Sequence, residues 1–206
     1  MKTTPQPQAT TKRTGCNMRM LHKLTPMQMQ EAERLEKRYY GENHVAGWEK
    51  SMEWQKSYPW MSCFIQQQDK VVAFLDLLPV HWDFYNKLLL GERDTDQLVE
   101  DDVVGLDHAT PGQYPLLLLT IIVAEEVRNQ GLLHLMFQDR IDYYQRLETK
   151  GIKFPVVGTE NFTAEGCSFS QKRGWNLRLV KSPTHHVYEV DWAAFQKMWT
   201  KKEMDR

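Results

Sequence analysis

Cysteine is scarce in this chain of 206 residues, and the three present, Cys16, Cys63 and Cys167, lie far apart. No two of them form a Cys-x-x-Cys pair, and an odd, sparse set excludes a disulfide-stapled framework. No cysteine and histidine spacing is typical of a zinc site, so we expect no metal ion. Together these absences favour a reducing, cytoplasmic compartment.

Long apolar runs and an excess of one charge sign are also lacking. The longest apolar stretch, residues 114–124, is too short for a membrane-spanning helix, which needs about 20 residues. The polar N-terminal segment lacks the apolar core of a signal peptide. Lysine plus arginine number 26 and aspartate plus glutamate 27, for a formal net charge of -1. Because nucleic-acid-binding proteins usually carry a basic excess, we expect neither nucleic acid nor membrane as a partner.

What the chain does have is enough apolar material for a full core. Hydrophobic residues make up 41% of the sequence and aromatic residues 11%, which excludes wholesale disorder. Residues 1–16 are polar, with proline and glutamine, and are predicted to be a disordered tail. Residues 17–206 are predicted to form a single domain.

Strand and helix patterns alternate along this domain, which predicts an α/β (α+β) fold. Helices are expected over 25–40, 48–58, 83–91, 131–151, 163–173 and from 192 onward, with start signals such as the Thr25-Pro26-Met27-Gln28 capping box. Strands are expected over 18–24, 62–66, 71–78, 116–123, 154–158, 177–180 and 186–190. The acidic segment 92–102 reads as a solvated loop, or as a rim that attracts a cationic substrate.

The segment 120–136 carries the clearest chemical signal. A buried strand leads through a short turn, which contains Arg128 and Gly131, directly into a helix. The first N–H groups of a helix lack internal partners, and the helix dipole adds positive charge there, so this turn predicts a phosphate or pyrophosphate site. It matches neither G-x-G-x-x-G nor the P-loop pattern. A nucleotide-phosphate enzyme using the same helix terminus therefore stays open as one alternative.

Two motifs resemble one enzyme family. Residues 123–133, VAEEVRNQGLL, resemble the acyl-CoA-binding motif of the GNAT superfamily of N-acyltransferases, roughly V-x-P-x-x-R-x-x-G-x-G/A. Residues 159–175, TENFTAEGCSFSQKRGW, resemble that family's downstream segment of strand, Asn, helix, Gly and aromatic. The resemblance covers about 116–190. It implies a mixed, mostly antiparallel central sheet of six to seven strands flanked by helices, whose splayed central strand pair holds acyl-CoA.

The resemblance also implies site residues, with acetyl-CoA as the cosubstrate. The backbone of Ile121 and Val123 would bind the pantetheine, and Asn161 would contact the cofactor arm. The pyrophosphate would lie in a loop made of Arg128, Asn129, Gln130, Gly131, Leu132, Leu133 and His134. Three positions depart from the family pattern. Glu125 stands where proline is frequent, Leu133 replaces a small residue, which would crowd the pyrophosphate, and Ser170 stands where many members carry a tyrosine that protonates the leaving thiolate.

The catalytic groups are less defined, because the predicted central strand contains no carboxylate. Candidates for a base are Asp76, which interrupts the apolar run VVAFLDLL, and the polar residues Asp107, His108 and Glu125. A carboxyl group buried at Asp76 would need a partner or a raised pKa. Ser170 occupies the position of the general acid. Cys167 has no histidine arrangement to activate it, so we do not expect it to be a nucleophile.

The resulting hypothesis is an N-acetyltransferase that transfers an acetyl group from acetyl-CoA to a primary amine of a small molecule or peptide, by direct attack in a ternary complex. A second alternative is a degenerate protein of the same fold that binds acyl-CoA or a protein partner without turnover. The oligomeric state stays open, with a homodimer among the options. Tryptophans 48, 54 and 60 are interpreted as packing residues or as lining of an acceptor pocket.

Overall fold

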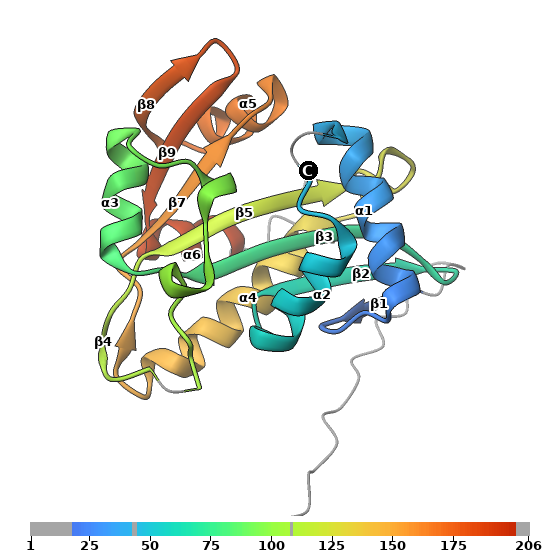
Figure 1. Ribbon diagram of the computed structural model, residues 1–206, viewed down its shortest axis with the longest axis horizontal. Helices are drawn as coiled ribbons and strands as arrows, with labels where there is room; N and C mark the ends of the chain where they lie inside the picture. Colours follow the sequence, from blue (N-terminus) through green and yellow to red (C-terminus); the bar gives the residue numbers. More distant parts are fainter. Residues whose placement is uncertain (1–17, 43–44, 108, 201–206) are drawn as a thin grey trace, which may run out of the picture.

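The computed structural model describes residues 18–42, 45–107 and 109–200 (Figure 1). The predicted tail, residues 1–16, and the candidate base His108 lie outside this part of the chain. The helices are α1 (Pro26–Tyr40), α2 (Trp48–Ser57), α3 (Trp82–Leu90), α4 (Leu132–Glu148), α5 (Ala164–Lys172) and α6 (Trp192–Thr200), with 3₁₀ turns η2 (Thr95–Gln97), η3 (Glu100–Asp102) and η4 (Glu125–Val127). The strands are β1 (Met18–Leu21), β2 (Ser62–Gln67), β3 (Lys70–Pro79), β4 (Gly112–Gln113), β5 (Leu116–Val123), β6 (Ile152–Lys153), β7 (Val156–Asn161), β8 (Asn176–Ser182) and β9 (His185–Asp191).

Seven strands form the main sheet in the order β1-β2-β3-β5-β7-β9-β8. Only the β5–β7 pair is parallel, and the other neighbours are antiparallel. The predicted fold class, a mixed and mostly antiparallel sheet of six to seven strands flanked by helices, is confirmed. The short strands β4 and β6 pair in a separate two-stranded sheet that the sequence pattern does not predict.

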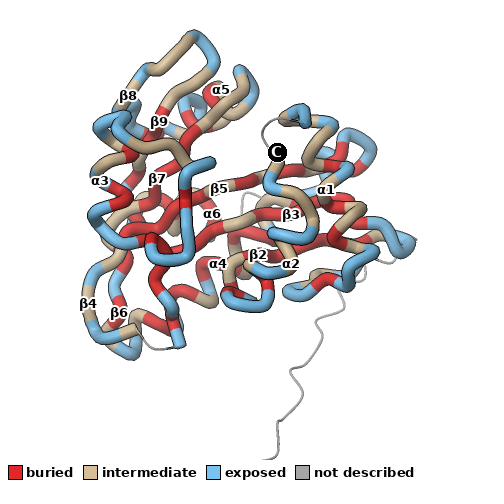
Figure 2. Tube along the Cα trace, viewed as in Figure 1, coloured by how far each residue is buried: buried red, intermediate tan, exposed pale blue. Residues whose placement is uncertain are grey.

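Helices cover both faces of the sheet, and residue alternation along the strands separates the two faces. On β2, Cys63 lies against α4, with its thiol directed at the carbonyl of Met136. The flanking residues Ser62 and Phe64 face the opposite side, toward α1 and α2. Buried residues follow the central strands, whereas β8 at the sheet edge is largely exposed (Figure 2). The face toward α1 and α2 is the one that holds the cavity described below.

Several predicted boundaries differ from the structure, and the strand expected over 18–24 already ends at Leu21. The strand expected over 154–158 is β7, Val156–Asn161. Pro155 precedes it and cannot donate to a ladder, so regular pairing begins after it. The helix expected to end at Gly151 ends at Glu148 and is followed by a turn. β7 also continues past the predicted end at 158, so Asn161 is its last residue.

Candidate functional site

The two central strands separate partway along their length. β5 and β7 pair only through Leu116–Leu118 and Val157–Thr159, although β5 continues to Val123 and β7 to Asn161. At the last pair, the Thr159 hydroxyl donates to the Leu118 carbonyl at 2.9 Å. The Leu118 carbonyl therefore bonds to a side chain, and no longer to a backbone N–H group, where the ladder between β5 and β7 ends. The predicted splayed strand pair is present in the structure.

Beyond Leu118 and Thr159, β5 and β7 diverge and leave a gap, called the splay below. Backbone polar groups of β5 face this gap. Ala124 N–H donates to the Val72 carbonyl at 2.8 Å, so this pair belongs to the hydrogen-bonded set of the β3–β5 ladder. In an antiparallel ladder such pairs alternate, so the N–H and C=O groups of Ile121 and Val123 point away from β3, toward the gap. Their carbonyls accept from side chains instead, Tyr40 Oη at 3.4 Å and Arg128 Nε at 3.3 Å. The N–H groups of these two residues are therefore positioned for a ligand between the strands.

The turn after β5 leads into α4 with a backbone that exposes N–H groups. Asn129 has φ 62° and Gly131, the N-cap of α4, has φ 75°. The first helical hydrogen bond runs from Leu135 N–H to the Gly131 carbonyl at 3.1 Å, so the N–H groups at the start of the helix have no acceptor within it. A side chain at Gly131 would meet no atom within 4 Å, so the space in front of this terminus is open. A helix N-terminus with such free donors is suited to binding an anion.

Contacts from α1 fix the same turn. The hydroxyl of Tyr39 accepts from Glu125 N–H at 3.1 Å. The Arg128 guanidinium lies 5.4 Å from the centre of the Tyr39 ring, and one of its nitrogens is 3.8 Å from a Glu125 carboxylate oxygen. Leu133, which departs from the family pattern, packs partly buried against the core and lines the cavity. Its side chain is therefore anchored to the body of the protein.

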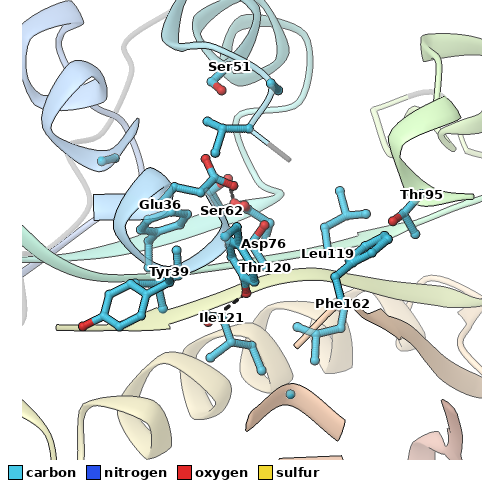
Figure 3. Close-up of a pocket in the computed structure, with 18 of the residues that line it drawn as sticks. Glu36, Tyr39, Ser51, Ser62, Asp76, Thr95, Leu119, Thr120, Ile121 and Phe162 are labelled. Carbon is cyan, nitrogen blue, oxygen red and sulfur yellow. Dashed lines mark hydrogen bonds between the residues drawn. The ribbon is translucent and has the colours of Figure 1, made fainter. Parts of the chain in front are cut away.

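A cavity of about 700 Å³ lies over the splay, between the sheet and helices α1 and α2 (Figure 3). Its size is that of a small-molecule site. The predicted site residues that line it are Asp76, Ile121, Val123, Glu125, Arg128, Leu133 and Asn161. The cavity thus brings the candidate base, the gap-facing backbone of β5 and part of the anion turn into one space.

Asp76 lies in this cavity at the centre of the sheet. Its carboxylate accepts from the Ser62 hydroxyl at 2.5 Å and from the Thr120 side chain. Burial raises the pKa of Asp76 to about 6, although the two hydroxyl donors and the charge of Arg140 act in the opposite direction. A carboxyl group with a pKa near neutrality is suited to proton transfer.

Glu36 on α1 is a site residue that the sequence reasoning missed. It lines the same cavity, and Figure 3 shows its side chain beside those of Ser62, Asp76 and Thr120. Burial raises the pKa of Glu36 to about 8, and the negative charges of Asp76 and Glu33 add to the effect. A signal was available, because Glu36 lies seven residues after the buried Met29 and so shares the apolar face of the helix.

Tyr40, one helical turn after Glu36 on α1, is a second site residue that the sequence pattern does not predict. Its hydroxyl is the donor to the Ile121 carbonyl, and burial raises the pKa of Tyr40 to about 12. The phenol is therefore protonated at neutral pH and acts as a hydrogen-bond donor at the splay. It joins Tyr39 in attaching α1 to the end of β5.

Ser170 and Asn161 bond to each other. Ser170 is fully buried, and its hydroxyl accepts from Asn161 Nδ2 at 2.9 Å. Ser170 is not among the residues that line the cavity, whereas Asn161 is. Asn129, Gln130, Gly131, Leu132 and His134 of the turn lie outside the cavity, and so does Asp107. Ser170 is thus placed to orient Asn161.

A charged cluster closes the side of the cavity next to β7. The side chain of Glu160 is fully buried and bonds to Lys181, to His185 Nε2 at 2.7 Å, and to Thr95 N–H and hydroxyl at 2.6 and 2.8 Å. Lys181 also pairs with Asp94. Part of the acidic segment 92–102 is therefore neutralised within the protein.

Two other groups of residues considered in the sequence, Cys167 and the tryptophans, lie in the packed body of the protein or in the cavity wall. Cys167 is buried, and burial raises the pKa of its thiol. Trp60 belongs to the core and Trp54 lines the cavity. Within residues 18–42, 45–107 and 109–200 no group of three or more histidine, cysteine or acidic side chains is arranged to hold a metal ion. The helices of this same part are all too short or too polar to cross a bilayer.

Comparison with known proteins extends these observations. The sequence matches no known family profile and no curated protein. Solved structures do match. The loading GNATL domain of CurA from Lyngbya majuscula superposes with a TM-score of 0.59 at 16% identity, covering 87% of this chain and 98% of that one. The PaiA N-acetyltransferase from Thermoplasma acidophilum, solved with coenzyme A, gives 0.51 at 10% identity, covering 85% and 99%.

A third match is the diaminobutyrate acetyltransferase EctA from Paenibacillus lautus, solved with its substrate and coenzyme A. It gives a TM-score of 0.50 at 9% identity, covering 86% of this chain and 96% of that one. At such identities the likeness concerns the fold. The chain spans nearly the full length of each of these proteins.

Proposed function

We propose that this chain, whose fold is that of the GNAT N-acyltransferases, transfers an acetyl group from acetyl-CoA to a primary amine. The observation that carries the proposal is the meeting of three features in one cavity. These are the gap-facing backbone of β5, the edge of the anion turn at Arg128 and Leu133, and the carboxyl group of Asp76. An acyltransferase needs a place for the thioester, a place for the cofactor phosphates and a base for the amine.

The residues for the cosubstrate follow from this arrangement. The N–H groups of residues 129–134 would hold the pyrophosphate, with Arg128 beside them. The gap-facing backbone groups of Ile121 and Val123 would bind the pantetheine arm, as a third strand does in a sheet. Asn161, oriented by Ser170, would contact the arm from β7. Acetyl-CoA supplies the thioester that is the acetyl donor.

Asp76 serves as the base in this proposal. An alkyl ammonium has a pKa near about 10.4 and is not nucleophilic until it loses a proton. The Asp76 carboxylate, held by Ser62 and Thr120, takes that proton. The neutral amine attacks the thioester carbonyl, and N–H donors of β5 stabilise the oxygen as it becomes anionic. When the carbon–sulfur bond breaks, the sulfur leaves with the second proton of the nitrogen, which gives the amide and the free thiol.

The first experiment is thermal unfolding of the purified chain with and without acetyl-CoA. A ligand present at 100 times its Kd adds about 2.7 kcal/mol to the free energy of unfolding. We expect a clear rise of Tm with acetyl-CoA, little with ATP or NAD, and thiol release when a panel of primary amines is added.

Two other outcomes separate the alternatives. Protection by acetyl-CoA without thiol release for any amine would favour a binding protein that has kept the fold without turnover. Tighter binding of ATP than of acetyl-CoA would favour a nucleotide-phosphate enzyme at the same helix terminus and would end the acyltransferase proposal.

A further inference from the structure

Glu36 is a cavity carboxylate that has no counter-charge in the structure. Within the described ranges it accepts no hydrogen bond and forms no ion pair. The neighbouring lysine on its helix, Lys37, pairs instead with Glu33 and Glu42 at 3.4 and 2.9 Å. Glu36 nevertheless points into the same space as Asp76 (Figure 3). Glu36 is partly buried. A carboxylate that loses part of its contact with water without gaining a partner loses solvation free energy, so this position favours a ligand that brings a positive charge.

The charges around the pair support the same reading. The charges that act on Glu36 are those of Asp76 from β3 and Glu33 from its own helix, neither of them cationic. Arg38, Lys50 and Arg128 also line the cavity, but none of them forms an ion pair with Glu36 within the described ranges. Arg140 acts on Asp76 from α4, on the other side of the sheet, where it bonds to Trp60 and Asp139. At neutral pH the two carboxyl groups therefore hold one proton between them, and the pair carries a single negative charge.

Apolar side chains form part of the wall around this charge, beside polar ones such as Glu33, Lys50 and Ser51. On the side of α1, α2, β2 and β3 the cavity is lined by Met29, Ala32, Trp54, Met61, Phe64 and Phe74. The rings of Phe64 and Phe74 lie 5.8 Å apart. Gln55 also lies in this wall, but its side-chain amide accepts from Leu24 N–H and donates to the Leu24 carbonyl. A ligand that places a cation at the carboxyl pair thus has a group of apolar side chains against which to bury a carbon-rich body.

We propose that Glu36 and Asp76 together form the recognition site for the ammonium group of the acceptor, and that the acceptor is a small amine with an apolar, carbon-rich body. This inference rests on the proposed acyl transfer and names the substrate class for it. Glu36 is the specificity residue, and Asp76 is the group that takes the proton.

The charge balance explains why two carboxyl groups are useful. The bound ammonium neutralises the single negative charge of the pair. When an ammonium proton moves to Asp76, the N–H bond breaks, an O–H bond forms, and the amine and both carboxyl groups are neutral. No uncompensated charge remains in the cavity before the amine attacks, so the transfer creates no buried ion.

The test measures amine binding directly, so it does not depend on turnover. Calorimetry at pH 9, where Glu36 is ionised and an alkyl amine with a pKa near about 10.4 is still cationic, would compare 2-phenylethylamine with 2-phenylethanol, which has the same body without the charge, and with 1,4-diaminobutane, which is cationic but lacks the apolar ring. We expect the amine to bind the wild-type protein at least about tenfold more tightly than the alcohol, and more tightly than the diamine.

The variant Glu36→Gln keeps the size of the side chain and removes its charge. It should weaken binding of 2-phenylethylamine at least about tenfold and leave the alcohol nearly unchanged. The matched control is Glu53→Gln, an exposed glutamate of α2 outside the cavity, which should bind all three probes as the wild type does. Far-UV circular dichroism and the unfolding midpoint confirm that each variant is folded.

Three results would overturn the inference. These are equal binding of the amine and the alcohol, no detectable binding of the amine, or full retention of amine binding in Glu36→Gln. Each is independent of acetyl-CoA protection in thermal unfolding. A protein that binds the amine through Glu36 but gains no stability from acetyl-CoA would contradict the proposed acyl transfer while leaving the ammonium site standing.

Discussion

At the scale of single residues, Asp76 makes the sharpest prediction. If its carboxylate takes the proton of the amine, Asp76→Asn should lower kcat by about 100-fold or more, the usual size of a general-base effect. Because the pKa of Asp76 is about 6 and the base must be ionised, wild-type kcat/KM should rise with pH through about 6. This limb should vanish in the variant. Steady-state thiol release between pH 5 and 9 measures both effects.

The matched control is Asp69→Asn, in the exposed turn between β2 and β3. It should leave rate and pH profile unchanged. Asparagine preserves the shape of Asp76, so Asp76→Asn should still be protected by acetyl-CoA. A variant that keeps both that protection and the wild-type pH limb would rule out Asp76 as the base.

The two carboxyl groups of the cavity differ in how visible they are in the sequence. Asp76 interrupts a continuous apolar strand, and that anomaly alone points to a special environment. Glu36 lies in a helix with several other charged residues, where most glutamates are solvated. Only the helical spacing from Met29 and Ala32 distinguishes it, and only the folded arrangement shows that α1 crosses the sheet at Asp76. Local sequence patterns do not show that α1 and β3, which are distant in the sequence, lie against each other.

At the scale of elements, the turn between β5 and α4 predicts how acetyl-CoA binding can be removed without unfolding the protein. Gly131→Glu would place a negative charge at the helix N-terminus, where it opposes a bound pyrophosphate. A side chain there meets no atom within 4 Å, but the φ of 75° carries some strain. We expect the acetyl-CoA Kd to rise at least about tenfold, measured by calorimetry.

Gly174 is a close control for that strain. Its φ is 71°, and a side chain there also meets nothing within 4 Å, but it follows α5, away from the turn. Gly174→Glu should lose a similar amount of stability, about 1 kcal/mol, and bind acetyl-CoA normally. Equal loss of binding in both variants would mean that strain, and not charge at the turn, is responsible.

Elements with strong local signals are predicted well from this sequence. The capping box at Thr25 fixes the start of α1, and the apolar run of β5 with the turn after it fixes the start of α4. The short strands β4 and β6 have no such signal, because each is only two residues long. The order of strands and the length of the β5–β7 pairing depend on contacts between distant segments, and they entered the prediction only through the family resemblance.

At the scale of the whole molecule, the carboxyl pair predicts how stability depends on pH. Folding raises the pKa of Glu36 to about 8 and that of Asp76 to about 6. Between about pH 4 and pH 8 the folded protein therefore binds more protons at these two groups than the unfolded chain does. Stability rises with pH only where the unfolded state binds more protons, so the pair lowers the free energy of unfolding as pH rises through this window. His22, whose pKa is lowered chiefly by burial, acts in the opposite direction near its ordinary pKa of 6.5.

Glu36→Gln isolates the larger contribution. Each unit of pKa shift corresponds to about 1.4 kcal/mol, so the variant should be more stable than the wild type by about 2 kcal/mol or more at pH 8, and by much less at pH 5. Urea unfolding at the two pH values gives the difference, with Glu53→Gln as the control that should follow the wild-type slope. A wild-type slope retained in Glu36→Gln would mean that Glu36 ionises normally in the folded protein. The same charge that an ammonium ligand would neutralise thus costs stability in its absence, so a cationic acceptor should stabilise the protein most above pH 8, where both carboxyl groups are ionised.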